Sequence, residues 1–126
     1  MQLRFRRLPA TFAVCRLPPD APIPACIATA PFTSITRTDR ELSIVCALDR
    51  APQDAQCESP WTCFKLEGPF PFVLTGILTS ILNPLTQGGV PIFAVSTFDT
   101  DYVLVKEEHA PTALEILKKA GHTLTD

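Results

Sequence analysis

In the second half of the chain, the spacing of apolar residues is typical of strands in some stretches and of helices in others. Residues 61–66 and 92–98 are short runs rich in apolar and β-branched residues, which is typical of strands. Between them, apolar residues recur every three or four positions, as on one face of a helix; they are Leu74, Ile77, Leu78, Ile81, Leu82 and Leu85. Pro84 predicts that the regular part of this helix is kinked or ends near Asn83.

A hairpin and a second helix follow. Residues 92–106 have the pattern of a strand, a tight turn and a second strand. Pro111 suits the first turn of a helix, Gly121 suits its end, and residues 122–125 can add an edge strand. The second half therefore predicts the order βαββαβ, an α+β fold of the ferredoxin-like type with an antiparallel sheet and both helices on one face.

The hairpin pattern occurs twice. Residues 31–46 align without a gap on residues 91–106. The aligned acidic positions are Asp39 with Asp99 and Glu41 with Asp101. Such internal similarity indicates a duplicated supersecondary unit.

The two copies differ in length upstream of the hairpin. Residues 14–17 match residues 63–66, but fewer residues connect the first pair to its hairpin. We therefore expect a degenerate N-terminal repeat at residues 1–60 and a complete C-terminal repeat at residues 61–126.

Composition and charge exclude several classes of protein. Hydrophobic residues make up 46% of the 126, and the mean hydropathy of +0.19 does not fit a disordered chain. The net charge of −2 argues against a nucleic-acid binder, which normally has a basic face. Arg4, Arg6 and Arg7 form the one basic cluster, and their alternation with apolar residues fits the solvent side of a strand.

Targeting and cysteine chemistry point to a reducing compartment. No run approaches the roughly 20 apolar residues that span a bilayer, and the N-terminus lacks the apolar segment of a signal peptide. The five cysteines, Cys15, Cys26, Cys46, Cys57 and Cys63, form no C-x-x-C pair and have no histidine at metal-ligand spacing. We expect reduced thiols, no metal, no membrane contact and a cytoplasmic protein. Cys57 is the thiol expected to be exposed.

Several motifs together resemble a known family. They are EGP at 67–69, GGVPIFAVST at 88–97, TFDTDYVLV at 97–105, AVCRL at 13–17 and TRTDRELSIVC at 36–46. The chain resembles the ACT-like domain of small stand-alone bacterial proteins, and is similar to the regulatory ACT repeats of aspartate kinases and to cytosolic arginine sensors of animal cells. This resemblance implies tandem ACT domains that exchange elements between repeats and bind an amino acid or similar small effector.

The resemblance also sets expectations about partners and chemistry. It implies a regulatory module without catalytic activity or cofactor, acting on an unknown regulated protein. A homodimer is expected as well.

An amino-acid ligand needs a group that accepts its carboxylate. If the first long helix begins near Phe72 or Val73, the amides of Leu74, Thr75 and Gly76 point out of its N-terminus and suit an anion. Gly76 also has no side chain to obstruct the ligand.

The ammonium group of the ligand needs anionic partners. Glu67 at a strand end and Asp99 or Asp101 at the hairpin are candidates, with hydroxyls of Ser96 and Thr97 nearby. The resemblance favours Thr97 and Asp101. Spacing alone leaves ordinary explanations open: a solvated carboxylate at Glu67, a turn residue at Asp99 and an edge-strand charge at Asp101.

Two other functions stay open. A structural or interaction protein could use an exposed sheet edge to hold a partner. An acylphosphatase-like hydrolase would need an arginine and an amide side chain together, for which Arg16 and Asn83 are the candidates. His109 and His122 lie near helix ends, where histidine is usually a capping or solvated residue, and neither has a recognisable nucleophile partner.

Overall fold

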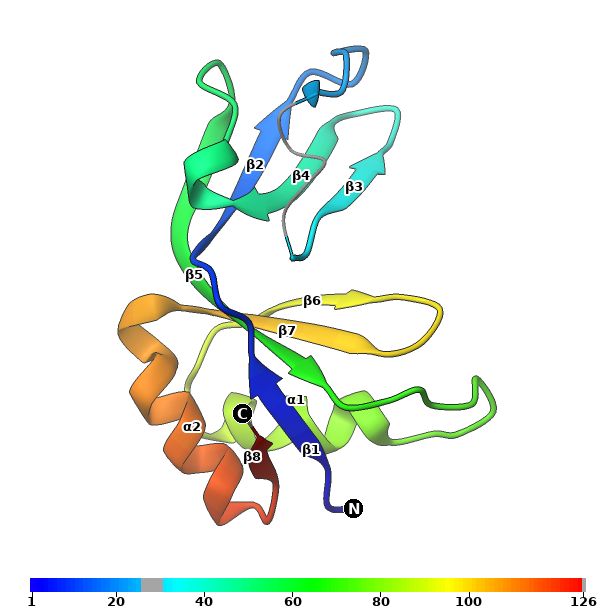
Figure 1. Cartoon of the computed structure of the whole chain (residues 1–126), viewed down its shortest axis with the longest axis vertical. Helices are drawn as coiled ribbons and strands as arrows, with labels where there is room; N and C mark the ends of the chain where they lie inside the picture. Colours follow the sequence, from blue (N-terminus) through cyan, green and yellow to red (C-terminus); the bar gives the residue numbers. More distant parts are fainter. Residues whose placement is uncertain (26–30, 126) are drawn as a thin grey trace. The chain divides into compact units, whose positions relative to one another are not determined.

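The computed structural model describes residues 1–25 and 31–125, and these form two compact units (Figure 1). The C-terminal unit consists of residues 1–8 and 62–126, and the N-terminal unit of residues 9–61. Strand β5, Gln56–Leu66, contributes its first residues to the N-terminal unit and its last residues to the C-terminal unit. The assignment of residues 1–60 and 61–126 to two repeats stays a prediction.

The C-terminal unit has the predicted α+β order. After β5 come α1 (Ile77–Gln87), β6 (Phe93–Ser96), β7 (Asp101–Lys106), α2 (Ala110–Lys119) and β8 (Thr123–Thr125). The buried faces of both helices and the strands share one core, which contains Phe64, Leu66, Ile77, Ile81, Leu85, Val103, Val105, Ala113 and Leu117. The ferredoxin-like βαββαβ arrangement is confirmed.

An N-terminal strand completes the sheet of this unit. Strand β1, Arg4–Arg7, pairs antiparallel with β5, and Phe5 lies opposite Leu66. On its other edge β1 pairs with β8, and this pair is parallel. The predicted antiparallel sheet thus contains one parallel pair, in which β8 adds to the outer edge of β1. Phe5 is fully buried and packs edge-to-face on Phe64, with ring centroids 5.5 Å apart.

The N-terminal unit is built on antiparallel strands. Strands β2 (Phe12–Leu17), β3 (Ser34–Arg37) and β4 (Leu42–Ala47) are antiparallel, and β2 also pairs with the first half of β5. The β3–β4 hairpin is the one predicted at residues 31–46. Its separate core contains Ala13, Cys15, Leu17, Leu42, Ile44 and Cys46.

Helix α1 differs from the prediction at both ends. It begins at Ile77, because the backbone first makes a turn in which the Leu74 amide donates to the Pro71 carbonyl at 3.0 Å. Gly76 is the N-cap and has a φ of 82°, a left-handed conformation that glycine adopts without strain. The helix continues past Asn83 and through Pro84 to Gln87, so of the two alternatives predicted for Pro84, an end near Asn83 is wrong and a kink stays a prediction.

His122 explains how α1 accommodates its proline. Pro84 has no amide hydrogen, so the Ser80 carbonyl four residues earlier lacks its helical donor. The His122 Nε2 lies 2.8 Å from that carbonyl oxygen and donates to it, while Nδ1 accepts from the Leu3 amide at 3.0 Å. His122 is only 4% exposed, so the expectation of a capping or solvated residue is wrong for this histidine. It is a buried bridge between Leu3, the residue before β1, and α1.

Removing this bridge is expected to destabilise the protein. In His122→Ala the Leu3 amide and the Ser80 carbonyl both lose their partner, at a cost of roughly 2 to 4 kcal/mol in free energy of unfolding, measured by urea denaturation. Pro84→Ala restores an amide donor for Ser80, so His122→Ala should cost less in that background. Equal costs in both backgrounds would contradict the role given to the imidazole.

Over residues 1–25 and 31–125, no helix combines the length and apolar character needed to cross a membrane.

Candidate functional site

A pocket lies beside the N-terminus of α1, entirely within the C-terminal unit. It has a volume of about 290 Å³ and is bounded by the segment that leads into α1 and by the β6–β7 turn. Its lining residues are Phe70, Pro71, Phe72, Leu74, Gly76, Ile77, Leu78, Thr79, Ser96, Thr97, Phe98, Asp99, Thr100 and Asp101. The pocket thus joins an apolar wall to a polar turn.

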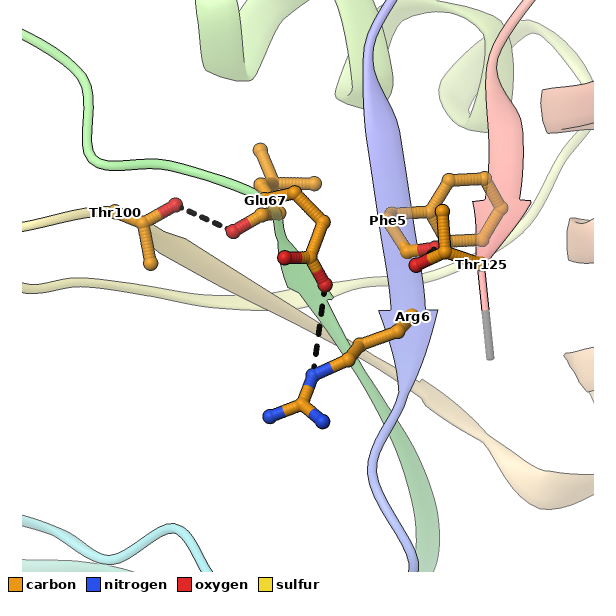
Figure 2. A network of polar contacts seen from close by, with 6 residues as sticks. Phe5, Arg6, Glu67, Thr100 and Thr125 are labelled. Atoms are coloured by element: carbon orange, nitrogen blue, oxygen red, sulfur yellow. Dashed lines mark hydrogen bonds and ion pairs between the residues drawn. The ribbon is translucent and has the colours of Figure 1, made fainter.

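The polar turn is held by its own hydrogen bonds. Ser96 and Asp101 are directly opposite on β6 and β7, and the Ser96 hydroxyl donates to the Asp101 carboxylate. The Thr97 amide and hydroxyl both donate to the Thr100 carbonyl, at 2.8 and 3.0 Å. The buried Thr100 hydroxyl in turn donates to the Leu66 carbonyl at 2.7 Å (Figure 2). These bonds anchor the turn to the end of β5.

The loop after β5 packs closely on the same turn. The Phe70 amide donates to the Asp99 carbonyl at 2.9 Å. A Cβ atom at Gly68 would lie 3.0 Å from that carbonyl oxygen and 3.1 Å from Thr100 Cβ. A side chain at this position of the EGP motif would therefore make unusually tight contacts, and the two segments would have to move apart by a few tenths of an ångström.

Aromatic side chains form the rim of the pocket. Phe72 and Phe98 pack edge-to-face with ring centroids 5.1 Å apart, although they are 74% and 80% exposed. Val73 and Leu74 are exposed beside Phe72. Large apolar side chains in contact yet open to solvent are typical of surfaces that cover a ligand or a partner.

The charges of the pocket are all negative. Asp99 and Asp101 are the only charged side chains among the lining residues, and Asp99 is exposed. One Asp101 oxygen accepts from Ser96, and the other has no hydrogen-bond partner in the part of the chain that the structure describes. A cationic group is therefore the complementary ligand group at this end of the pocket.

The beginning of α1 offers the opposite polarity. Ile77, Leu78 and Thr79 form its first turn and line the pocket, and no side chain caps their amides. Uncapped amides at a helix N-terminus suit an anion. The pocket can therefore accept a carboxylate at α1 and an ammonium at the β6–β7 turn.

The structure brings most of the candidate residues together. Leu74, Gly76, Ser96, Thr97, Asp99 and Asp101 all line the pocket. Thr75 is exposed and is not among the lining residues. The Leu74 amide was expected to bind an anion, but it already donates to the Pro71 carbonyl, so this expectation is wrong. The amides available to an anion are those of Ile77–Thr79, three to five residues later. Ligand binding by these residues stays a prediction.

Glu67 lies elsewhere. It directly follows β5, and its carboxylate forms an ion pair with Arg6 of β1, at 3.5 Å from Arg6 Nε (Figure 2). Both residues line a separate polar hollow together with Arg4, Gly68 and Thr125. Glu67 is therefore not brought to the pocket, because strand pairing with β1 provides its counter-charge.

The sequence reasoning missed the aromatic lining. No binding role was predicted for Phe70, Phe72 or Phe98. Each of them is nevertheless next to a residue or motif for which such a role was predicted. The available signal was PFPF at 69–72, an apolar loop of which Phe70 packs on the core while Phe72 is exposed. Arg16 and Asn83, the pair required for the hydrolase, lie on β2 and α1 in different units.

Comparison with protein families gives two matches. Residues 56–119 match the family model described as the ACT domain. Residues 10–54 match a second family model, described only as an N-terminal domain. No curated protein matches the chain.

Solved structures extend the comparison. A protein from Agrobacterium tumefaciens is 43% identical, with a TM-score of 0.93 over 99% of this chain and 93% of that one. A protein of unknown function from Vibrio cholerae, described as a possible transport protein, is 14% identical, with a TM-score of 0.75 over 95% and 91% of the chains. The ligand-free regulatory subunit of aspartate kinase from Thermus thermophilus is 12% identical, with a TM-score of 0.63 over 88% and 93%. The last two show a shared fold alone.

Proposed function

This chain belongs to the ACT domain family, and from that premise we propose that it is a non-catalytic regulatory module that binds an amino acid or a similar small zwitterion. The ligand occupies the pocket between the first turn of α1 and the β6–β7 turn. Its ammonium group binds the Asp101 carboxylate, and its carboxylate binds the amides of the first turn of α1.

The observation that carries the proposal is the polarity of this pocket. Asp99 and Asp101 lie at one side and the uncapped α1 amides at another, so a molecule with both charges is favoured over a simple cation or anion. Phe70, Phe72 and Leu78 supply apolar surface for the rest of the ligand. The regulatory role is supported by the name of the Thermus protein, a regulatory subunit of aspartate kinase with this fold.

A partner-binding role is the second candidate. The exposed apolar side chains of Phe72, Val73, Leu74 and Phe98 favour contact with another protein, either a second copy of this chain or the regulated protein. A homodimer and a cytoplasmic location stay predictions.

A thermal-shift screen against the twenty amino acids and common metabolites tests the proposal. A ligand that binds only the folded state stabilises it by RT ln(1 + [L]/Kd), about 2.7 kcal/mol at a hundredfold excess over Kd. We expect a saturable rise in melting temperature for one chemical class of amino acid, and no rise for its decarboxylated amine or its deaminated acid.

The screen is repeated at two protein concentrations to separate the candidates. A melting temperature that depends on protein concentration but on no small molecule would contradict amino-acid binding and support the partner-binding role.

A further inference from the structure

Three cysteines of the N-terminal unit lie close together in its sheet. Cys15 is on β2, Cys46 on β4 and Cys57 at the start of β5. The strand register places Cys15 directly opposite Cys57 in the antiparallel pair of β2 and β5. Cys46 is diagonal to Cys15, because its direct partner on β2 is Ala13.

The Cys15 and Cys57 positions fit the geometry of a disulfide. Residues directly opposite in an antiparallel pair have Cα atoms about 4.5 to 5.5 Å apart, which lies within the range of about 4.4 to 6.8 Å found for disulfides. The two side chains point to the same face of the sheet, as direct partners do. The pKa of the Cys15 thiol is raised by burial first, then by the neighbouring Cys57 thiol, and less by Cys46.

The two thiols differ in access to solvent. Cys15 is 2% exposed and belongs to the core of the N-terminal unit, whereas Cys57 is exposed at its edge. An oxidant can therefore reach Cys57 directly, and Cys15 is protected from it. Cys57 is therefore the thiol that is oxidised first, and Cys15 reacts with it afterwards.

We propose that Cys57 and Cys15 form an oxidation-responsive pair that closes into an intramolecular disulfide when the protein meets a peroxide. Cys57 is the sensing thiol and Cys15 the resolving thiol. The site is independent of the amino-acid pocket, which lies in the other unit.

The reaction has two balanced steps. The Cys57 thiolate attacks one oxygen of hydrogen peroxide, an S–O bond forms, the O–O bond breaks, and the second oxygen leaves as water after taking a proton. The Cys15 sulfur then attacks the sulfenic sulfur, the S–S bond forms, the S–O bond breaks, and hydroxide leaves as water with the Cys15 proton. Two thiols and one peroxide give one disulfide and two waters.

Closure would tie the start of β5 to β2. The disulfide joins residues 15 and 57, and the chain between them contains the β3–β4 hairpin. Such a cross-link restricts the unfolded chain and should raise the melting temperature of the oxidised protein. A reducing agent should reverse that rise.

Peroxide treatment of the full chain tests the pair. The protein is titrated with hydrogen peroxide, the remaining thiols are alkylated under denaturing conditions, and intact mass and peptide maps are recorded. We expect a monomer that has lost two hydrogen atoms and two alkylation sites, with a Cys15–Cys57 cross-linked peptide. Dithiothreitol should restore both sites.

Three variants serve as tests and control. Cys57→Ser changes an exposed position, so the protein should stay folded by circular dichroism yet give no cross-link. Cys63→Ala alters a buried thiol of the other unit, whose pKa burial raises to about 12, and should form the cross-link as the parent does. Cys15→Ala should leave Cys57 to be oxidised beyond the sulfenic state.

Three outcomes would overturn the proposal. One is a parent protein in which Cys57 alone accumulates sulfinic or sulfonic acid. Another is a disulfide between Cys57 residues of two chains. The third is a cross-link of Cys57 to Cys46, or to Cys26, which lies outside the described residues.

Discussion

Replacing Asp101 with asparagine is expected to weaken ligand binding by about 2 kcal/mol, roughly thirtyfold in Kd. Asparagine keeps the size of the side chain and can still accept from the Ser96 hydroxyl, but it removes the negative charge that faces the ligand ammonium. Isothermal titration with the amino acid found in the thermal screen measures the effect.

The duplicated hairpin provides a matched control for this substitution. Glu41 is the aligned residue of the first hairpin and lies outside the pocket. Glu41→Gln removes one negative charge from the protein, as Asp101→Asn does, and should leave Kd unchanged. An Asp101→Asn protein with the affinity of the parent would show that this carboxylate does not bind the ligand.

Replacing Phe5 with alanine is expected to lower the free energy of unfolding by about 3 to 5 kcal/mol. Phe5 is fully buried between the strands and helices of the C-terminal unit and packs on Phe64. Because Phe5 comes from the N-terminal strand β1, a loss of this size would show that residues 1–8 are part of the C-terminal core. Urea denaturation followed by circular dichroism measures it.

Phe98→Ala is the matched control for Phe5→Ala. Phe98 is 80% exposed, so its side chain contributes little buried apolar surface to the folded protein. Its replacement should therefore change the free energy of unfolding by less than about 1 kcal/mol. A Phe5→Ala protein as stable as Phe98→Ala would contradict the placement of β1 between β5 and β8.

The local elements of the fold were predictable from periodicity. The apolar stripe at residues 77–85 is the buried face of α1, and the alternating runs at 92–106 are β6 and β7. These patterns reflect which face of each element is buried, and that information is local. The ferredoxin-like class follows from the order of such elements.

Long-range pairing was not predictable in this way. The place of β1 between β5 and β8 depends on contacts more than fifty residues apart in sequence, and its RFRR pattern carries no signal for its neighbours. The His122 bridge was missed for the same reason, since the missing amide of Pro84 and the imidazole are far apart in the chain. Both are outcomes of packing in three dimensions.

The pocket was predicted in part. Ser96, Thr97, Asp99 and Asp101 were found because a hairpin brings residues close in sequence together in space. Glu67 was predicted at the pocket but lies outside it. A carboxylate at the end of a strand can lie on either face of the sheet, and the ion pair of Glu67 with Arg6 depends on the position of β1. The start of α1 was misplaced because the apolar Phe72, Val73 and Leu74 continue the helical pattern while facing solvent.

Mapping of ligand contacts by amide chemical shifts tests the central claim most directly. The ¹⁵N-labelled protein is titrated with the amino acid identified in the thermal screen, and shifts are followed residue by residue. Binding in the proposed pocket predicts saturable changes at Ile77–Thr79 and at Ser96–Asp101, with small changes elsewhere. Changes centred instead on Arg4, Arg6 and Thr125, or on the N-terminal unit, would contradict this pocket as the ligand site.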